Sequence, residues 1–184
     1  MSRVIVIEFV SLDGVLEDPD GGDRTERGGW AFRYGPESVA GDKFQLGEVL
    51  DQGALLLGRR TWQKFAGIWP SRTDEFSARM NRVPKLVLSR SLGDVSAWAN
   101  SCVIGRDLVD EVSARSGDLI VAGSTSVVDA LREHDLVDEY RLLVFPTVLG
   151  QGRRLFPDGI ASVNLELRSA QPVGAPVLLV YGRG

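Results

Sequence analysis

The sequence predicts an α/β domain, in which short buried strands alternate with helices. Two patterns predict this class: short β-branched apolar runs recur along the chain, and segments with helical spacing of apolar residues separate them. The composition agrees, because 43% hydrophobic and 25% charged residues among 184 are typical of a globular chain with a sizeable core. No repeat, low-complexity tract or linker interrupts the sequence, so residues 1–184 are expected to form a single domain.

The predicted strands share runs of valine, isoleucine and leucine, which suit a buried pleated surface. The first run is apolar except for Glu8, so its strand is expected to be buried on both faces. Pro84 opens the third strand, and a turn over 172–174 joins the arms of a terminal hairpin. In chain order the strands are residues 4–10, 54–57, 85–88, 102–104, 119–122 and 140–145, followed by hairpin arms at 165–168 and 177–181.

The predicted helices lie between these strands, and their apolar residues recur at helical spacing. A helix begins at Arg59 or Arg60 after the second strand, and Ser124 or Thr125 caps the helix after the fifth. Between the first strand and first helix, residues 11–35 form a long loop rich in glycine and proline, and such loops are usually functional or mobile. The other predicted helices are 37–51, 73–80 and 108–114.

The chain has few side chains suited to acid–base or nucleophilic chemistry. It contains one cysteine, Cys102, and one histidine, His134, so neither an intramolecular disulfide nor a His/Cys zinc site can form within one chain. Cys102 is expected to be a small buried hydrophobe, and His134 a surface residue near the end of its helix. If the protein is an enzyme, its chemistry is expected to come from a cofactor.

Charge and hydropathy exclude two classes of partner. Lys and Arg number 21 against 25 Asp and Glu, and the formal net charge of -4 argues against nucleic acid as a partner. The N-terminal apolar run is interrupted by Glu8 and is too short for a membrane span or a signal peptide. The expectation is a cytoplasmic protein whose partner is a small molecule.

Three polar turns follow predicted strands, at the positions where open α/β sheets bind ligands. Glycine lets the backbone approach a ligand, the free N–H groups of a helix start attract an anion, and arginine or hydroxyl side chains suit phosphate. The turns comprise Gly58, Arg59, Arg60 and Thr61 in the first, Leu88, Ser89 and Arg90 in the second, and Gly123, Ser124, Thr125 and Ser126 in the third.

Three such turns at strand ends favour an extended ligand with several phosphates, such as a dinucleotide. No acidic residue follows the third strand to bind a free ribose hydroxyl, whereas Ser89 and Arg90 suit a 2′-phosphate, so NADP is expected rather than NAD. The usual fingerprints are missing, since residues 150–155 fail the G-x-G-x-x-G pattern and no Walker A or H-E-x-x-H motif occurs. A standard Rossmann dehydrogenase is therefore disfavoured.

Five segments together resemble a dihydrofolate-reductase-like domain. They are SLDG at 11–14, LLLGRRTW at 55–62, KLVLSR at 85–90, LIVAGSTSVVDAL at 119–131 and DEYRLLVFPTVLGQGRRLF at 138–156. The pattern is most similar to the reductase domain of bifunctional riboflavin-biosynthesis deaminase-reductases and to its stand-alone relatives; the zinc signature of the deaminase half is absent. The resemblance implies a mixed, mainly parallel sheet flanked by helices, with a C-terminal antiparallel hairpin.

The resemblance also assigns roles to residues. It places the first turn on the cofactor phosphates, the second on the 2′-phosphate and the third on the pyrophosphate of NADPH. Ser124 stands where the family often has the second glycine of a Gly-Gly pair whose peptide bond has an unusual geometry. Asp13 and Gly14 match a loop beside the nicotinamide, where riboflavin-pathway reductases have an acid that contacts substrate. Asp42, on the predicted helix, lies near the acid by which dihydrofolate reductases bind the pterin.

Three further residues are candidates for substrate contact. Trp30 is a candidate lid residue in the glycine-rich loop, and Phe145 and Thr147 end the sixth strand. Core packing is the alternative role for these aromatic residues, and an ordinary turn is the alternative for Asp13 and Gly14.

The resemblance implies an NADPH-dependent reductase that transfers hydride to a small heterocyclic or sugar-type substrate. The leading substrate is 5-amino-6-(5-phosphoribosylamino)uracil of riboflavin biosynthesis. Dihydrofolate, which Asp42 alone supports, and another small carbonyl or imine are the enzymatic alternatives. The alternative of another class is a non-catalytic NADP-binding module. Relatives often dimerise, so a homodimer is an expectation, although no segment of the sequence identifies its surface.

Overall fold

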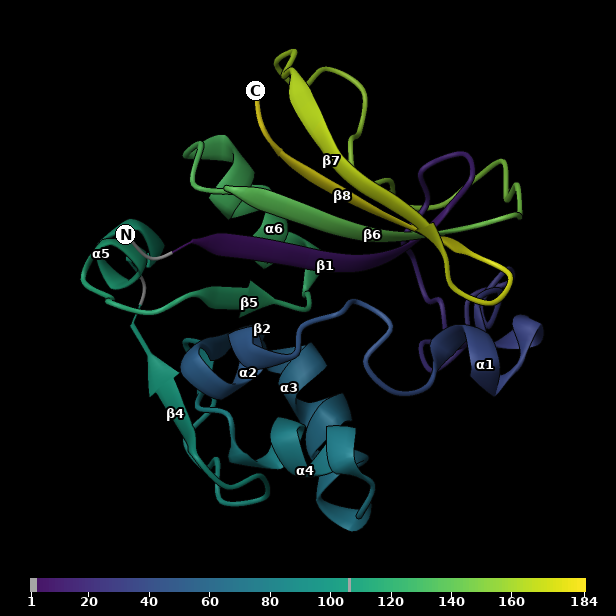
Figure 1. Cartoon of the computed structure of the whole chain (residues 1–184). Helices are drawn as coiled ribbons and strands as arrows, with labels where there is room; N and C mark the ends of the chain where they lie inside the picture. Colours follow the sequence, from purple (N-terminus) through teal and green to yellow (C-terminus); the bar gives the residue numbers. More distant parts are fainter. Residues whose placement is uncertain (1–2, 106) are drawn as a thin grey trace. The chain divides into compact units, whose positions relative to one another are not determined.

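A computed structural model describes residues 3–105 and 107–184 of the chain (Figure 1). The described residues divide into two compact units, each of which combines two separate segments of the sequence. Unit 1 contains the described residues up to Val6 together with Leu46–Asp138, and unit 2 contains Ile7–Gln45 together with Glu139–Gly184. The expectation of a single domain stays a prediction, because compactness alone does not say whether either unit folds by itself.

The strands form a mixed eight-stranded sheet in the order β4-β3-β2-β5-β1-β6-β8-β7. The pairs from β4 to β1 are parallel, and β6, β8 and β7 pair antiparallel. The predicted α/β class, with a mainly parallel sheet and an antiparallel C-terminal hairpin, is therefore confirmed. The strands are β1 (Val4–Ser11), β2 (Ala54–Gly58), β3 (Lys85–Leu88), β4 (Ser101–Ile104), β5 (Leu119–Val121), β6 (Glu139–Phe145), β7 (Leu165–Pro172) and β8 (Val177–Arg183).

Strands β2, β3 and β5 of unit 1 are buried on both faces, as their uninterrupted aliphatic sequences predict. Leu55, Leu57 and Ile120 are each 0% exposed. The α4 and α5 helices begin at Asp74 and Asp107, whose carboxylates accept a bond from the main-chain N–H three residues later. The helical segments of unit 1 are α2 (Glu48–Gln52), α3 (Arg59–Ala66), the 3-10 turn η2 (Trp69–Ser71), α4 (Glu75–Arg82), α5 (Leu108–Ser113) and α6 (Thr125–Glu133).

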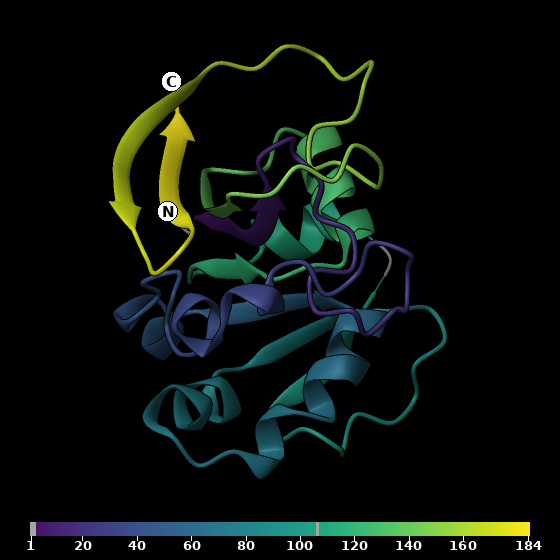
Figure 2. The same ribbon diagram turned by 90° about the vertical axis from the view of Figure 1, so that its right-hand side faces the viewer.

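Unit 2 has an aromatic core against its antiparallel strands. Trp30 and Phe145 are 1% and 0% exposed, and their rings meet edge to face with centroids 5.6 Å apart. The short segments η1 (Phe32–Tyr34) and α1 (Pro36–Val39) also belong to this unit. Figure 2 shows α1 near the turn of the β7–β8 hairpin, where Ala175 N donates to Ser38 Oγ at 3.2 Å.

The helix predicted over 37–51 is wrong. It consists of α1 and α2, which are separated by residues 40–47 without helical structure. Within this segment Gly41, Gln45 and Gly47 have φ angles of 77°, 52° and 42°, which no right-handed helix can contain. The apolar spacing that predicted one helix therefore describes two short helices and a turn, and Asp42 lies in the turn.

Two single-residue expectations have different outcomes. Cys102 is exposed on β4, which has a neighbour on one side only, so the expectation of a buried cysteine is wrong. His134 is the exposed C-cap residue of α6, as predicted. Among the described residues, no helix is both long and apolar enough to cross a membrane.

Candidate functional site

The structure places the three predicted turns at one edge of the sheet in unit 1. Gly58, the last residue of β2, pairs in register with Leu88, the last residue of β3. On the other side of β2, Leu56 pairs with Val121, the last residue of β5. The strands are parallel, so their carboxyl ends lie together. The connections from β2 and β5 then lead in opposite directions along the sheet, which is the arrangement at which α/β proteins bind ligands.

The first and third turns are in direct contact. Gly58 N donates to Gly123 O at 3.3 Å. A Cβ atom on Gly58 would lie 2.2 Å from Ser124 Oγ and 3.2 Å from Ser124 N, so no larger residue fits there without displacing Ser124. Glycine at position 58 is therefore required by the close approach of β2 to the turn after β5.

The peptide bond between Gly123 and Ser124 is cis, and Gly123 has a φ of 82°. The unusual peptide geometry is therefore present with serine in place of the second glycine. The Ser124 and Ser126 hydroxyls lie 2.9 Å apart and share a hydrogen bond at the start of α6.

Two helices begin at this edge without a side-chain cap. Gly58 is the N-cap residue of α3 and Ser124 that of α6, and neither accepts a main-chain bond through its side chain. The α4 and α5 helices, in contrast, are capped by aspartate. The first N–H groups of a helix have no partner within the helix and carry partial positive charge, so two uncapped helix starts side by side suit an anion.

Three arginines at this edge are free of other interactions. Within residues 3–105 and 107–184, the exposed side chains of Arg59, Arg60 and Arg90 make no hydrogen bond or ion pair. Ser89 Oγ accepts bonds from Ser91 N at 3.2 Å and Leu92 N at 3.0 Å, which leaves its hydroxyl proton available to a ligand. An acidic protein that leaves three neighbouring guanidinium groups unpaired presents a local positive site suited to phosphate.

Asp13, in unit 2, is held by three hydrogen bonds. Ser11 Oγ donates to Oδ1 at 2.7 Å, Leu149 N donates to Oδ1 at 3.1 Å, and Gly150 N donates to Oδ2 at 2.8 Å. These bonds, that of Ser11 above all, lower the pKa of Asp13 from 3.8 to about 2. Asp13 is therefore ionised at neutral pH and cannot donate a proton. Its role as an acid that contacts substrate stays a prediction.

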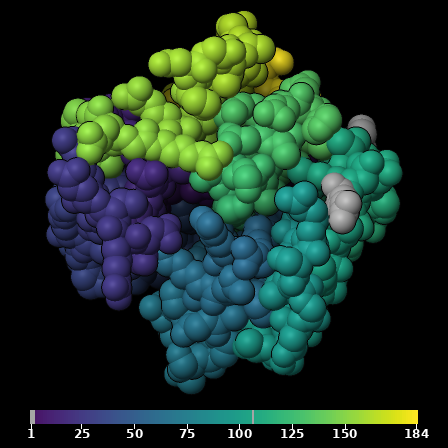
Figure 3. All heavy atoms as spheres, turned by 180° about the vertical axis from the view of Figure 1, so that it is seen from behind, coloured from purple at the N-terminus to yellow at the C-terminus, as the bar shows by residue number. Residues whose placement is uncertain are grey.

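The carboxylate of Asp13 joins two loops of unit 2. Arg154 Nε donates to Asp13 O at 3.1 Å, and Val15 forms an isolated antiparallel bridge with Arg154. Gly14, with a φ of 84°, makes the turn between these contacts. Figure 3 shows the purple segment after β1 beside the yellow-green segment near residue 150 on the surface of this unit. Asp13 thus fixes the loop that follows β1.

The proposed substrate contacts occupy different environments. Trp30 is 1% exposed and its Nε1 donates to Glu17 O at 2.8 Å, so its indole packs in the core, and a lid role for it stays a prediction. Phe145 is fully buried as well. Thr147 is partly exposed, and its carbonyl accepts from Leu12 N at 2.8 Å. Asp42 is partly exposed in the turn before α2. For both Asp42 and Thr147, a role in binding substrate stays a prediction.

Sequence reasoning missed Glu8. This residue lies within β1 and is partly buried, and its carboxyl group makes no hydrogen bond or ion pair within the described part of the chain. Burial raises the pKa of its carboxyl from 4.5 to about 8, so the side chain keeps its proton at neutral pH. The signal in the sequence was a single charge inside an otherwise apolar strand.

Comparison with known proteins agrees with this fold. Uncharacterized protein YyaP of Bacillus subtilis (strain 168) is 25% identical over 190 residues, which cover 97% of this chain and 94% of YyaP. A Shewanella sp. PV-4 protein described as a riboflavin biosynthesis protein has a TM-score of 0.75 at 21% identity, with 99% of both chains covered. A pyrimidine reductase-like protein of Corynebacterium diphtheriae has a TM-score of 0.62 at 13% identity, with coverage of 98% and 91%.

RibD of Acinetobacter baumannii has a TM-score of 0.63 at 17% identity and covers all of this chain, which spans 58% of RibD. These likenesses to solved structures show a shared fold. The sequence itself matches the family model described as the RibD C-terminal domain over residues 2–179, in agreement with the resemblance carried by the five segments. Since that match covers nearly the whole length, the chain belongs to the RibD C-terminal domain family.

Proposed function

We propose that the protein is an NADPH-dependent reductase that transfers hydride to a small heterocyclic or sugar-type substrate of the kind represented by 5-amino-6-(5-phosphoribosylamino)uracil. The observation that carries this proposal is the edge of unit 1, where two uncapped helix starts meet three unpaired arginines. Membership of the RibD C-terminal domain family supports a reductase-type function in the riboflavin pathway.

The residues of this edge fit the parts of NADPH. Arg59, Arg60 and the start of α3 would bind phosphate, and the start of α6 from Gly123 to Ser126 would bind pyrophosphate. Ser89 and Arg90 would bind the 2′-phosphate, since a hydroxyl proton and an unpaired guanidinium complement its oxygens. Bound NADPH supplies a hydride, and the protein supplies binding and orientation. Unit 2 by itself carries a loop fixed at Asp13 and a carboxyl proton held at Glu8, and a role for either residue in the reaction belongs to this proposal.

Titration of the tryptophan fluorescence with NADPH and NADH tests the first step. Saturable quenching by NADPH at sub-millimolar concentration is expected. An NADPH-oxidation assay with the riboflavin-pathway intermediate, dihydrofolate and a panel of small carbonyls then separates the remaining alternatives. Binding without oxidation of NADPH by any of these substrates would favour the non-catalytic NADP-binding module, and absence of binding would contradict the whole proposal.

The substitution Arg90→Ala should weaken NADPH much more than NADH. A charge-assisted hydrogen bond contributes about 1.5–3 kcal/mol, so a loss of roughly 10- to 100-fold in NADPH affinity is expected. NADH, which lacks the 2′-phosphate, should bind the variant and the wild type equally. The two dissociation constants are measured by the same titration, and equal weakening of both would refute the 2′-phosphate assignment.

The substitution Gly58→Ala should damage the same site through the backbone. Its Cβ would lie 2.2 Å from Ser124 Oγ, so the start of α6 must shift, and misplacement of this kind should lower NADPH affinity about tenfold or more. Gly93→Ala is the matched control, because a Cβ at Gly93 meets nothing within 4 Å. Titration and urea unfolding of both variants measure the effect, and similar behaviour of the two would contradict the close-packing requirement.

A further inference from the structure

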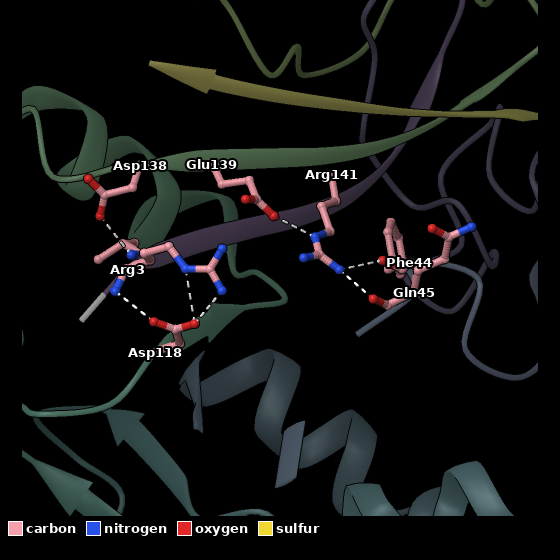
Figure 4. Close-up of polar contacts among 8 residues, drawn as sticks. Arg3, Phe44, Gln45, Asp118, Asp138, Glu139 and Arg141 are labelled. Atoms are coloured by element: carbon pink, nitrogen blue, oxygen red, sulfur yellow. Dashed lines mark hydrogen bonds and ion pairs between the residues drawn. The ribbon is translucent and has the colours of Figure 1, made fainter. Parts of the chain in front are cut away.

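Arg141 and Glu139 form a nearly buried ion pair on β6 in unit 2 (Figure 4). Arg141 Nε donates to Glu139 Oε1 at 2.6 Å, and the side chains are 12% and 8% exposed. Removing charged groups from water costs free energy, so a pair at this depth is a weak source of stability. Its position therefore calls for another role.

The second end of the Arg141 guanidinium holds the turn between α1 and α2. Arg141 Nη1 donates to Phe44 O at 3.0 Å and also to Gln45 O. Residues 42–45 belong to no helix or strand, and within the turn Gln45 N donates to Asp42 O at 3.2 Å. The Phe44 and Gln45 carbonyls lack the partners that a helix or sheet would supply. Gln45 Nε2 adds a bond to Gln171 Oε1 at 2.8 Å. Arg141 thus fixes a segment that its own sequence leaves irregular.

The segment carries an aromatic ring into a set of stacked side chains. Phe44 stacks on Phe9 of β1, with ring centroids 5.4 Å apart and planes 23° apart. Phe9 also meets Phe32 edge to face at 6.4 Å, and Phe32 is 49% exposed. Phe9 and Phe44 are partly buried and pack against the core of unit 2, so the three rings form an aromatic surface at the margin of that core, with Phe32 as its exposed member.

We propose that Arg141 is a positioning residue for substrate: by binding the Phe44 and Gln45 carbonyls it keeps the Phe44 ring stacked on Phe9, and the aromatic surface of Phe9, Phe32 and Phe44 binds the planar ring of the substrate. This rests on the proposed reductase function for the existence of a substrate site. The position of the segment does not rest on it and can be measured separately. Glu139 orients the guanidinium from the other side.

Arg141→Lys is the informative variant. It keeps a cation beside Glu139, whereas an ammonium cannot reproduce the planar fork that reaches a carboxylate and two carbonyls together. Arg141→Gln removes the charge of the guanidinium. Lys43→Gln is the control, because it removes a charge from the turn between α1 and α2 at a side chain without a described partner. Hydrogen exchange of amides 42–47 should accelerate in Arg141→Gln, less in Arg141→Lys, and remain unchanged in Lys43→Gln.

The kinetic expectation is a change in KM rather than in kcat. With the substrate found in the NADPH-oxidation assay, Arg141→Gln should raise KM about tenfold or more and leave kcat and the NADPH dissociation constant within about threefold, with Arg141→Lys in between. Folate and riboflavin serve as planar-ring probes in equilibrium titrations should no substrate turn over, and their affinity should fall in the same order.

The outcomes separate the two proposals. Failure of the wild type to bind NADPH contradicts the reductase, while faster exchange in Arg141→Gln would still support Arg141 as the group that holds the turn. Unchanged exchange overturns the positioning role even in an active enzyme. Two outcomes overturn the substrate role of the aromatic surface. In the first, hydrogen exchange accelerates in Arg141→Gln while KM and probe affinity stay unchanged. In the second, the wild type binds neither substrate nor probe.

Discussion

Glu8→Gln should make the protein more stable at pH 8 and above than the wild type, and equally stable near pH 4.5. Glutamine keeps the size of the side chain and removes its ionisation. The cost of an unpaired carboxylate inside β1 then disappears from the folded state.

The direction of this pH dependence follows from the pKa of Glu8 in the folded protein. Burial raises the pKa of Glu8 from 4.5 to about 8, so between these values the folded protein binds more protons than the unfolded chain. The free energy of unfolding of the wild type should therefore fall as pH rises through this window, by at most about 1.4 kcal/mol per pH unit. Urea unfolding across the window measures the slope, which Glu8→Gln should flatten.

Glu26→Gln is the control for this experiment, because Glu26 is an exposed acid in the glycine-rich loop of the same unit. Its slope should match that of the wild type. A Glu8→Gln variant that retains the full wild-type slope would show that Glu8 is ionised in the folded protein at neutral pH. That result would remove the held proton from the proposed chemistry.

Lys85→Ala should be strongly destabilising. Lys85 is 0% exposed at the start of β3, and its Nζ donates to Asn81 O at 2.7 Å and Ala99 O at 3.0 Å. The ammonium also lies 4.4 Å from the centre of the Trp98 ring. Alanine leaves a cavity in place of the aliphatic stem and removes the donor to both carbonyls, so a loss of about 3 kcal/mol is expected.

Lys85→Met separates the stem from the ammonium. Methionine fills most of the space, so it should be less harmful than alanine. Lys43→Ala, at a partly exposed side chain, should have almost no effect. Burial lowers the pKa of Lys85 from 10.5 to about 8. The unfolded chain then holds more protons between these values, so wild-type stability should rise with pH in this range. Both Lys85 variants should lose that rise; a variant that keeps it would contradict the assignment.

Local patterns in the sequence predicted most elements because their signals act over a few residues. Aliphatic runs predict parallel strands since both faces are covered, and the strands so predicted are present. The helix over 37–51 failed for the opposite reason. Its apolar spacing is real, but Gly41, Gln45 and Gly47 adopt positive φ angles, and carbonyl groups of the turn find their donor on Arg141, almost a hundred residues away. No local pattern contains that partner.

The candidate site divides in the same way. The sequence determined the residue types of the three turns, the absence of an acid after the third strand, and the scarcity of other catalytic side chains. Strand pairing decided that Gly58 lies beside Leu88 and Gly123, and that two helix starts there are uncapped. Burial decided that Trp30 is a core residue and that Glu8 keeps its proton at neutral pH. Hydrogen bonds to its carboxylate decided that Asp13 is ionised there.

The physical reason is the range of each interaction. Backbone preference and the spacing of apolar residues are properties of neighbouring residues, so a sequence determines them alone, and here they specify the α/β class and the three turns that follow its strands. The pKa of a carboxyl and the exposure of an indole depend on atoms that distant segments bring within a few ångströms. For this protein, the sequence determined which chemistry is available, and the tertiary structure decided which side chains are free to perform it.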